Sequence, residues 1–313
     1  MPPSDCKRQQ KSERIVFLRS LLLQNNMLPV PLRAHLEMLL NTRIDSIRPI
    51  SGGDIHHAAL LTLADGRTFF MKYNTSPQAT EIFRTEALGL ALLGAARVIA
   101  TPKVQAQGTS DGWAFLLLEY IEPGYRTRQF WEDFGASLAA LHGTTSAQFG
   151  FAHNNFIGSL PQSNRRHDTW ENFYAEERLL PQMRLAGAHN RLNASDEKRL
   201  ESLCKKLSSI CPEEPPALTH GDLWSGNFLC NAASKPVLID PAASFAHREM
   251  DLAMSRLFGG FDAIFYQSYE ENWPLAPGFE ERLEVYQLYY LLVHVNLFGG
   301  GYVESVRSIL RRF

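Results

Sequence analysis

A short polar stretch contains the residue types best suited to chemistry in this chain. The stretch 219-THGDLWSGNFL-229 holds Asp222 and Asn227, five positions apart, within apolar surroundings. Asp, Gly, Ser and Asn bond readily to their own backbone, so one interpretation is that the stretch is only a turn. Asp240 argues for more, because it ends the predicted strand 237-VLID-240. One loop and one strand end therefore present three oxygen-bearing side chains.

Side chains of this kind suit a hard cation and a phosphate. Mg²⁺ prefers oxygen ligands and uses few from the protein, so Asn227 and Asp240 suffice when phosphate oxygens and water complete the shell. Asp222 is then available to orient an attacking hydroxyl group and to accept its proton. The pattern predicts phosphoryl transfer, with Asp222 as the catalytic residue and Asn227 and Asp240 as metal ligands.

Earlier residues fit a site for the phosphate donor. Lys72 lies inside a predicted strand, and Glu86 falls on the apolar stripe of the predicted helix 79–94. A buried carboxylate is costly unless paired, so we expect a Lys72–Glu86 ion pair. The alternative is that Lys72 is a charged residue on an edge strand and Glu86 lies at the rim of the apolar stripe. Gly52-Gly53 can place backbone N–H groups over a polyphosphate, but this turn lacks the full G-x-G-x-x-G spacing, and hairpin chemistry alone also explains it.

These residues must be positioned by two lobes. Residues 1–12 are polar and patternless and are predicted to form a disordered tail. Two short helices are expected from Glu13, followed by a five-stranded antiparallel sheet with one inserted helix, and then by a mainly helical half. A Pro-Gly turn places the boundary near residues 122–124, which gives an N-terminal lobe at 13–122 and a larger C-terminal lobe at 123–313. Predicted strands cover 44–74 (three strands), 98–107, 113–121 and 237–240; predicted helices cover 79–94, 128–142, 168–183, 194–209 and 278–299.

Composition and charge narrow the class of partner. The chain has 313 residues, and its 31 basic against 33 acidic residues offer no basic face for nucleic acid. No apolar run is long enough for a bilayer, and 15-IVFLRSLLL-23 is interrupted by Arg19, so we expect no membrane partner and a cytoplasmic protein. Four cysteines are too scattered for a disulfide framework or a zinc site and are predicted to be reduced thiols: Cys6, Cys204, Cys211 and Cys230.

The order of the motifs resembles that of protein kinases, which place an Asn five residues after the catalytic Asp and a metal-binding Asp after a short hairpin. Here His220-Gly221-Asp222 stands for His-Arg-Asp, and Asp240-Pro241 for Asp-Phe-Gly, as in the aminoglycoside and choline kinase branch. Trp224-Ser225 in the loop and the segment 157-IGSLPQ-162 make the chain similar to fructosamine kinases, also called ketosamine 3-kinases. The similarity covers most of the chain from Ile50.

This resemblance implies an α+β, protein-kinase-like fold of two lobes that binds ATP and Mg²⁺. Lys72, positioned by Glu86, would contact the α and β phosphates in the N-terminal lobe. The segment Glu119-Tyr120-Ile121 would bind the adenine edge through the carbonyl group of Glu119 and the N–H group of Ile121.

The resemblance also suggests supporting and substrate-binding residues. His220 and Asp251 would brace the catalytic loop, although Asp251 alone would be interpreted as a helix cap or a surface charge. Trp224 is a candidate platform for the sugar or its amine, or else a core aromatic residue that anchors the loop. His294 and Asn296 could reach the acceptor site, and a hydrogen-bonded core position is the alternative for His294.

The implied reaction is ATP-dependent phosphorylation of the 3-hydroxyl group of a ketosamine, the adduct of a sugar with a free amine or a protein lysine. The 3-phosphate is unstable and releases the amine, which makes the activity deglycation. Two alternatives stay open. One is a kinase of the same fold for an aminoglycoside or an amino alcohol, and the other is a nucleotide-binding pseudokinase, which the presence of Lys72, Asp222, Asn227 and Asp240 disfavours. The oligomeric state is open, with a monomer favoured.

Overall fold

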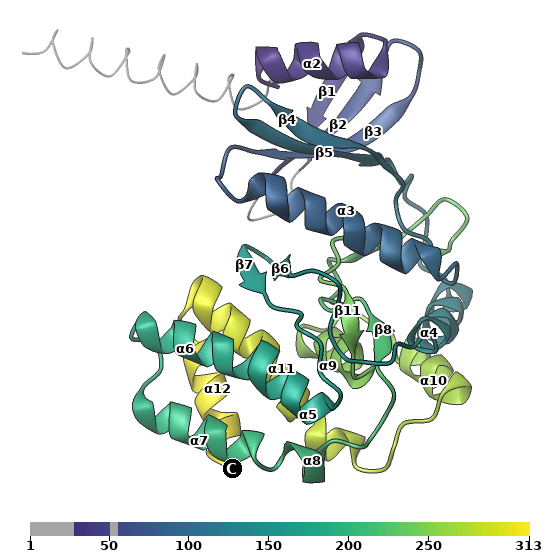
Figure 1. Cartoon of the computed structure of the whole chain (residues 1–313). Helices are drawn as coiled ribbons and strands as arrows, with labels where there is room; N and C mark the ends of the chain where they lie inside the picture. Colours follow the sequence, from purple (N-terminus) through teal and green to yellow (C-terminus); the bar gives the residue numbers. More distant parts are fainter. Residues whose placement is uncertain (1–27, 51–55) are drawn as a thin grey trace, which may run out of the picture. The chain divides into compact units, whose positions relative to one another are not determined.

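The computed structural model describes residues 28–50 and 56–313 (Figure 1). The predicted tail, the first predicted helix and Gly52-Gly53 lie outside the described residues. The chain divides into two compact units. Of the described residues, the first takes in those up to Thr80 together with Gln105–Tyr120, and the second comprises Glu81–Val104 and Ile121–Phe313. Most of the inserted helix therefore groups with the second unit, and not with the predicted N-terminal lobe.

The first unit is built on a five-stranded sheet of order β1-β2-β3-β5-β4. Its strands are β1 (Ile44–Pro49), β2 (His57–Leu63), β3 (Thr68–Asn74), β4 (Val104–Ser110) and β5 (Trp113–Glu119). The pairs β1–β2, β2–β3 and β3–β5 are antiparallel. Helix α2 (Val30–Leu40) buries Leu32 and Leu36 in the same core as Leu61, Met71 and Leu117 of the sheet. One amphipathic helix thus closes one face of the sheet.

Strand β3 confirms the predicted alternation of side chains. Phe69, Met71 and Tyr73 belong to the core that includes α2, so Lys72 points to the opposite face. Lys72 is nevertheless only 7% exposed, and Glu86 on helix α3 (Ala79–Ala95) is only 8% exposed. Buried charges need partners, so the burial of both residues favours the predicted ion pair, and the pair itself stays a prediction.

Strand β4 begins at Val104, six residues later than the predicted start at residue 98. Pro102 supplies no N–H group for a strand ladder. The apolar residue that suggested an earlier strand, Ile99, is buried in a core cluster of the second unit with Leu93 and Phe130. Burial against a different partner therefore explains the apolar pattern.

The second unit contains most of the helices and six short strands. The helices are α4 (Arg128–His142), α5 (Trp170–Phe173), α6 (Leu180–Ala188), α7 (Ala194–Cys204), α8 (Leu207–Ile210), α9 (Glu249–Leu257), α10 (Ala263–Asn272), α11 (Phe279–Phe298) and α12 (Tyr302–Leu310), with a π-helix, η1 (Tyr174–Leu179), between α5 and α6. The strands pair as β6 (Asn155–Ile157) with β7 (Leu160–Gln162), β8 (Ala217–Thr219) with β11 (Ser244–Ala246), and β9 (Phe228–Cys230) with β10 (Pro236–Leu238).

Two sequence predictions need correction here. We expected one short strand in this half, at 237–240, and the structure has six, because three-residue strands are too short to show alternation. The predicted helix 168–183 is interrupted by η1, which ends just before Pro181. Proline cannot donate to the preceding turn, and a widened turn at this point accommodates the missing N–H group.

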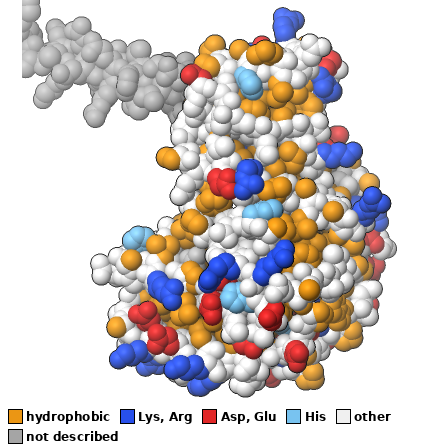
Figure 2. All heavy atoms as spheres, in the orientation of Figure 1, with side chains coloured by type: hydrophobic (Ala, Val, Ile, Leu, Met, Phe, Trp, Pro, Cys, Tyr) orange, Lys and Arg blue, Asp and Glu red, His pale blue; other side chains and the backbone are white. Residues whose placement is uncertain are grey.

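The surface agrees with the balanced charge of the sequence. On the face seen in Figure 2, basic and acidic side chains are interspersed, and neither sign gathers into one large patch. In the described part of the chain, no helix is long and apolar enough to cross a membrane. Cys204, Cys211 and Cys230 are free thiols, as predicted.

Candidate active site

Two antiparallel strand pairs of the second unit hold the predicted catalytic residues. The loop His220–Asn227 runs from the end of β8 to the start of β9. Across the second pair, Leu238 of β10 lies opposite Phe228 of β9, and the N–H group of Ile239 donates to the carbonyl oxygen of Asn227 at 3.0 Å. Asp240 is the next residue. The ladder therefore brings Asn227 and Asp240, the predicted metal ligands, to the same end of this hairpin.

Asn227 also contacts the predicted catalytic carboxylate. Its Nδ2 donates to Oδ2 of Asp222 at 2.9 Å and to the carbonyl oxygen of Asp222 at 2.8 Å. Because both bonds use the amide nitrogen, they fix the orientation of the amide and leave its oxygen as a possible ligand. An amide oxygen and a carboxylate on adjacent strand ends form a donor set that fits Mg²⁺.

The acidity of Asp222 is adjusted by its surroundings. Burial raises the pKa of Asp222 to about 7, with an opposing hydrogen bond from Asn227 and a reinforcing negative charge from Asp240. A carboxylate with a pKa near neutrality can both accept and return a proton at physiological pH. Asp222 thus has the property that a general base toward a hydroxyl group needs.

Asp251 of α9 accepts two backbone hydrogen bonds from the loop. Its Oδ2 accepts from the N–H group of His220 at 2.7 Å, and its Oδ1 accepts from the N–H group of Gly221 at 2.9 Å. Burial opposes ionisation of Asp251, but the hydrogen bond from His142 keeps its pKa below the ordinary value. A charged, fully buried carboxylate therefore fixes two consecutive peptide groups just before Asp222.

His220 joins the two halves of the site. Its Nε2 donates to the carbonyl oxygen of Ile239 at 2.8 Å, while its Nδ1 accepts from the N–H group of Asp222 at 3.2 Å. Burial lowers the pKa of His220, which favours the neutral ring that this bonding pattern requires. One imidazole thus links the catalytic loop to the strand end that precedes Asp240.

Gly221 is required by the same geometry. It has a φ of +82°, and a Cβ at this position would lie 2.2 Å from the carbonyl oxygen of Ala242. Only glycine adopts this conformation without strain and admits so close a backbone approach. This explains why the motif is His-Gly-Asp in this chain.

The residues predicted to bind the acceptor have different surroundings. Trp224 is 38% exposed, and its ring covers Gly226, where a Cβ would lie 2.4 Å from ring atoms. This exposure favours a platform over a core anchor. His294 is partly buried, donates from Nδ1 to the carbonyl oxygen of Tyr290 at 2.8 Å, and lies 4.7 Å from the exposed ring of Phe258. Their roles in substrate binding stay predictions.

Asn296 is the predicted acceptor residue whose contacts argue against that role. It is 6% exposed, and its Nδ2 donates to the backbone oxygen and to Oε1 of Gln182, both at 2.8 Å. The amide nitrogen is thus used in packing α11 against α6. His294 lies two residues earlier on α11, so the two side chains point to different sides of the helix.

The residues predicted to bind the nucleotide come from both units. Lys72 is in β3, Glu86 is in α3, and Glu119 is the last residue of β5. Tyr120 is the last residue of the first unit, and the second unit resumes at Ile121. Their roles in binding adenine and phosphates stay predictions.

Two residues that support the loop were not predicted from the sequence. His142, at the end of α4, donates from Nε2 to Asp251 at 3.2 Å and bonds through Nδ1 to the hydroxyl group of Tyr269 at 2.8 Å. All three residues are almost fully buried. His142 and Tyr269 stand in ordinary amphipathic helices far from the motif in sequence, so only the tertiary contact reveals them.

The fold and the loop define a phosphotransferase of the protein-kinase-like class. A macrolide 2′-phosphotransferase from Brachybacterium faecium, 15% identical, shares this fold with a TM-score of 0.58 over 88% of this chain and 96% of its own. Within that class, the family model for fructosamine kinase matches residues 32–313. The chain belongs to the fructosamine kinase family.

Individual relatives support this assignment. A protein from Lactiplantibacillus plantarum named as a probable ketoamine kinase is 41% identical over 274 residues, which cover 87% of this chain and 95% of the relative. The chloroplastic protein-ribulosamine 3-kinase of Arabidopsis thaliana is 36% identical, with coverages of 86% and 82%. The crystal structure of a candidate fructosamine-3-kinase from Thermobifida fusca is 36% identical and has a TM-score of 0.79, with coverages of 89% and 98%.

Proposed function

We propose that this protein is an ATP- and Mg²⁺-dependent ketosamine 3-kinase. It would transfer the γ-phosphoryl group of ATP to the 3-hydroxyl group of a ketosamine, carried by a small amine or by a lysine of a glycated protein. Loss of the unstable 3-phosphate would free the amine. The family match supports the reaction class, and the names of the relatives support the acceptor.

The observation that carries the proposal is the geometry of the loop around Asp222. Asp251 fixes the two peptide groups before Asp222, and Asn227 orients its carboxylate through a 2.9 Å hydrogen bond. In this position Asp222 would accept the proton of the sugar hydroxyl group as the oxygen attacks the γ-phosphorus. Positioning supplies most of the rate in such a transfer, because the protein itself performs little covalent chemistry.

Asn227 and Asp240 would hold Mg²⁺, and Lys72 would contact the donor phosphates. When bound, Mg²⁺ supplies positive charge against the phosphate oxygens. The residues of the chain do the rest. The β9–β10 ladder keeps the two ligands adjacent, and Trp224 would offer an aromatic surface next to the acceptor.

The test is phosphate transfer from Mg·ATP to a panel of acceptors by wild type, Asp222→Asn and Asp45→Asn. The panel contains lysine ribulosamine and fructosamine, an aminoglycoside and choline. We expect transfer to ketosamines alone, a loss of about 10³-fold in kcat for Asp222→Asn, and no change for Asp45→Asn, an exposed aspartate on β1. Transfer only to the aminoglycoside or to choline would support a kinase activity but contradict the ketosamine as acceptor. Undiminished transfer by Asp222→Asn would contradict the proposed role of Asp222.

A further inference from the structure

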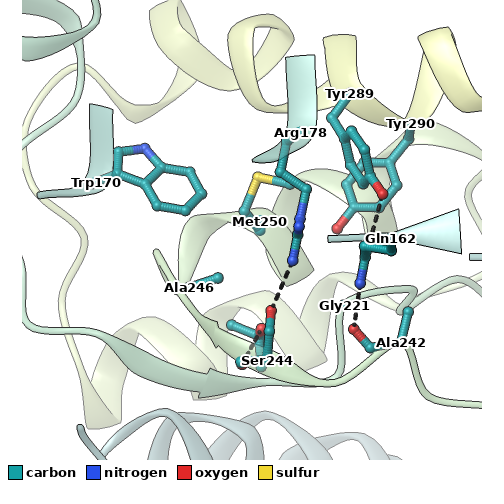
Figure 3. Close-up of a pocket in the computed structure, with 11 residues that line it drawn as sticks. Gln162, Trp170, Arg178, Gly221, Ala242, Ser244, Ala246, Met250, Tyr289 and Tyr290 are labelled. Atoms are coloured by element: carbon teal, nitrogen blue, oxygen red, sulfur yellow. Dashed lines mark hydrogen bonds between the residues drawn. The ribbon is translucent and has the colours of Figure 1, made fainter. Parts of the chain in front are cut away.

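A buried polar cluster contacts the chain segment that follows Asp240, and Figure 3 shows three of its members, Gln162, Arg178 and Tyr289. The cluster comes from the β6–β7 hairpin and the residues just after it, from η1 and from α11. Each of its side chains is at most 6% exposed. Its members are Asn155, Gln162, Asn164, Arg178 and Tyr289.

Side chains of the cluster donate one hydrogen bond to each of three consecutive residues of that segment. Nε2 of Gln162 donates to the carbonyl oxygen of Ala242 at 3.2 Å. Nδ2 of Asn155 donates to the carbonyl oxygen of Ala243 at 2.9 Å. Nη2 of Arg178 donates to Oγ of Ser244 at 3.2 Å. These bonds fix the path of the chain from two to four residues after Asp240.

The peptide group of Ala242 also touches the catalytic loop. Its N–H group donates to the carbonyl oxygen of His220 at 3.0 Å. Its carbonyl oxygen lies 2.2 Å from the place where a Cβ of Gly221 would stand. This carbonyl group is therefore enclosed between Gly221 and Gln162, so a shift at Gln162 would change the position of Asp240 relative to Asp222.

Internal bonds determine which way the amide of Gln162 faces. Its Oε1 accepts from the hydroxyl group of Tyr289 at 2.5 Å, and its Nε2 also donates to Oδ1 of Asn155 at 2.8 Å. With the oxygen engaged by Tyr289, the nitrogen must face Ala242. Figure 3 shows this line from Tyr289 through Gln162 to Ala242.

Arg178 is unusual because it is 3% exposed and its hydrogen-bond acceptors are neutral oxygens. They are the carbonyl oxygens of Ser163 and Glu177, Oδ1 of Asn164 and Oγ of Ser244. Its guanidinium also lies 4.5 Å from the ring centre of Phe173. Burying a guanidinium among neutral acceptors is costly, and a π-helix at such a position often marks a functional site.

We propose that Gln162 and Arg178 are positioning residues for the phosphoryl transfer. They hold residues 242–244 and thereby set the metal ligand Asp240 against the catalytic loop. This inference rests on the proposed function. Partners that orient metal ligands usually affect metal affinity by a factor of ten or more, and a role in packing alone would affect stability without that change.

The decisive variant is Gln162→Leu, which removes the bond to Ala242, together with the bonds to Asn155 and from Tyr289, at nearly constant volume. The matched control is Gln287→Leu, since Gln287 is a buried glutamine of the same unit that donates to the carbonyl oxygen of Ala253 at 3.1 Å. Mn²⁺ serves as the probe, and its affinity in the presence of AMP-PNP is measured by electron paramagnetic resonance. Thermal unfolding, kcat and the KM for a ketosamine are measured on the same samples.

We expect Gln162→Leu to weaken Mn²⁺ binding about tenfold and to lower kcat with little change in the KM for the ketosamine. Gln287→Leu should lose stability but keep the wild-type Mn²⁺ affinity and kcat. Ser244→Ala, which removes only one hydroxyl group, is the second variant and decides the matter if Gln162→Leu does not fold; we expect weaker Mn²⁺ binding, with a smaller loss than in Gln162→Leu.

Wild-type Mn²⁺ affinity and kcat in the folded variants would overturn the inference. So would an equal loss of Mn²⁺ affinity in Gln287→Leu, because the effect would then follow from general loosening of the unit. A wild type that binds Mn·AMP-PNP but phosphorylates no ketosamine would disprove the proposed acceptor. The comparison of Mn²⁺ affinities would still test the positioning role of Gln162 and Ser244.

Discussion

Gly221 and Gly66 share a left-handed backbone but differ in their surroundings. Gly221 has a φ of +82° and faces the carbonyl oxygen of Ala242, whereas Gly66, in the β2–β3 turn, has a φ of +86° and nothing within 4 Å of its hypothetical Cβ. Alanine at Gly66 would lower the unfolding free energy only by the cost of a left-handed backbone, about 1 kcal/mol. Alanine at Gly221 would add a steric clash beside Asp222.

We therefore expect Gly221→Ala to lose at least about 3 kcal/mol of unfolding free energy together with nearly all activity. Gly66→Ala should keep full activity. Urea denaturation and the ketosamine assay measure both effects. Equal behaviour of the two variants would show that the approach of Ala242 to the loop is unimportant.

His247 gives the stability a pH dependence. It is fully buried, donates from Nε2 to the carbonyl oxygen of Pro212 at 3.2 Å, and accepts at Nδ1 from the N–H group of Glu249. Burial lowers its pKa, with opposing contributions from Glu249 and Glu214 and a reinforcing one from Arg248. The unfolded chain then binds a proton that the folded protein does not. The contribution of His247 to the stability should therefore fall as the pH drops below 6.5.

This loss is at most about 1.4 kcal/mol for His247 at pH 5.5, one unit below its unfolded pKa. His247→Gln should start less stable at pH 7.5 and should decline less on acidification. Urea denaturation at several pH values measures the slope. A slope unchanged from wild type would mean that other groups cause the dependence.

At the scale of elements, α9 and α11 are joined by two ion pairs of different kinds. Arg282 and Glu249 are 5% and 0% exposed and make two side-chain bonds, whereas Arg256 and Glu280 form an exposed pair between the same helices. The buried pair determines how α9, which carries Asp251, packs against α11.

We expect Arg282→Met to lose about 3 to 5 kcal/mol, because Glu249 would stay buried without its partner. Arg256→Met should lose less than about 1 kcal/mol. Chemical denaturation compares them. A small loss in Arg282→Met would indicate that Glu249 becomes protonated or finds another donor. A changed dependence of the variant's stability on acid pH would indicate protonation of Glu249, and an unchanged dependence would indicate another donor.

The sequence predicted the longer elements well and the short ones poorly. Helices α4 and α11 and the first three strands are long enough for composition and spacing to reveal them. The six three-residue strands of the second unit have no measurable period, yet β8 to β11 position Asp222, Asn227 and Asp240. The motif thus pointed to the proposed catalytic and metal-binding residues without revealing the strands that hold them.

The supporting residues were hidden for a different reason. Gln162 and Arg178 lie on segments that matched the family pattern, but buried polar side chains look like surface residues in a single sequence. Their role depends on contacts with residues 242–244, far along the chain. Likewise, the sequence could not show that the amide nitrogen of Asn296 bonds to Gln182, and the role of Asn296 at the acceptor site stays a prediction.

At the scale of the whole molecule, ligand binding should stabilise the folded protein. A ligand at one hundred times its Kd adds about 2.7 kcal/mol. We expect Mg·ATP to raise the melting temperature of wild type and of Asp222→Asn, because Asp222 is proposed to act on the acceptor. Asp240→Asn should show a smaller rise. Thermal unfolding with ATP, with and without Mg²⁺, tests this, and an equal rise in both variants would exclude Asp240 as a metal ligand.

The β9–β10 hairpin also bears on the order in which the chain folds. Asn227 and Asp240 meet by closing a loop of about a dozen residues, which costs little chain entropy. Asp251 follows shortly after them in the sequence, whereas the bonds from His142 and Gln162 span far longer loops. Contacts between near neighbours form fast and distant ones slowly. The ligand pair should accordingly be assembled early, and the bonds that fix its final position should be among the last to form.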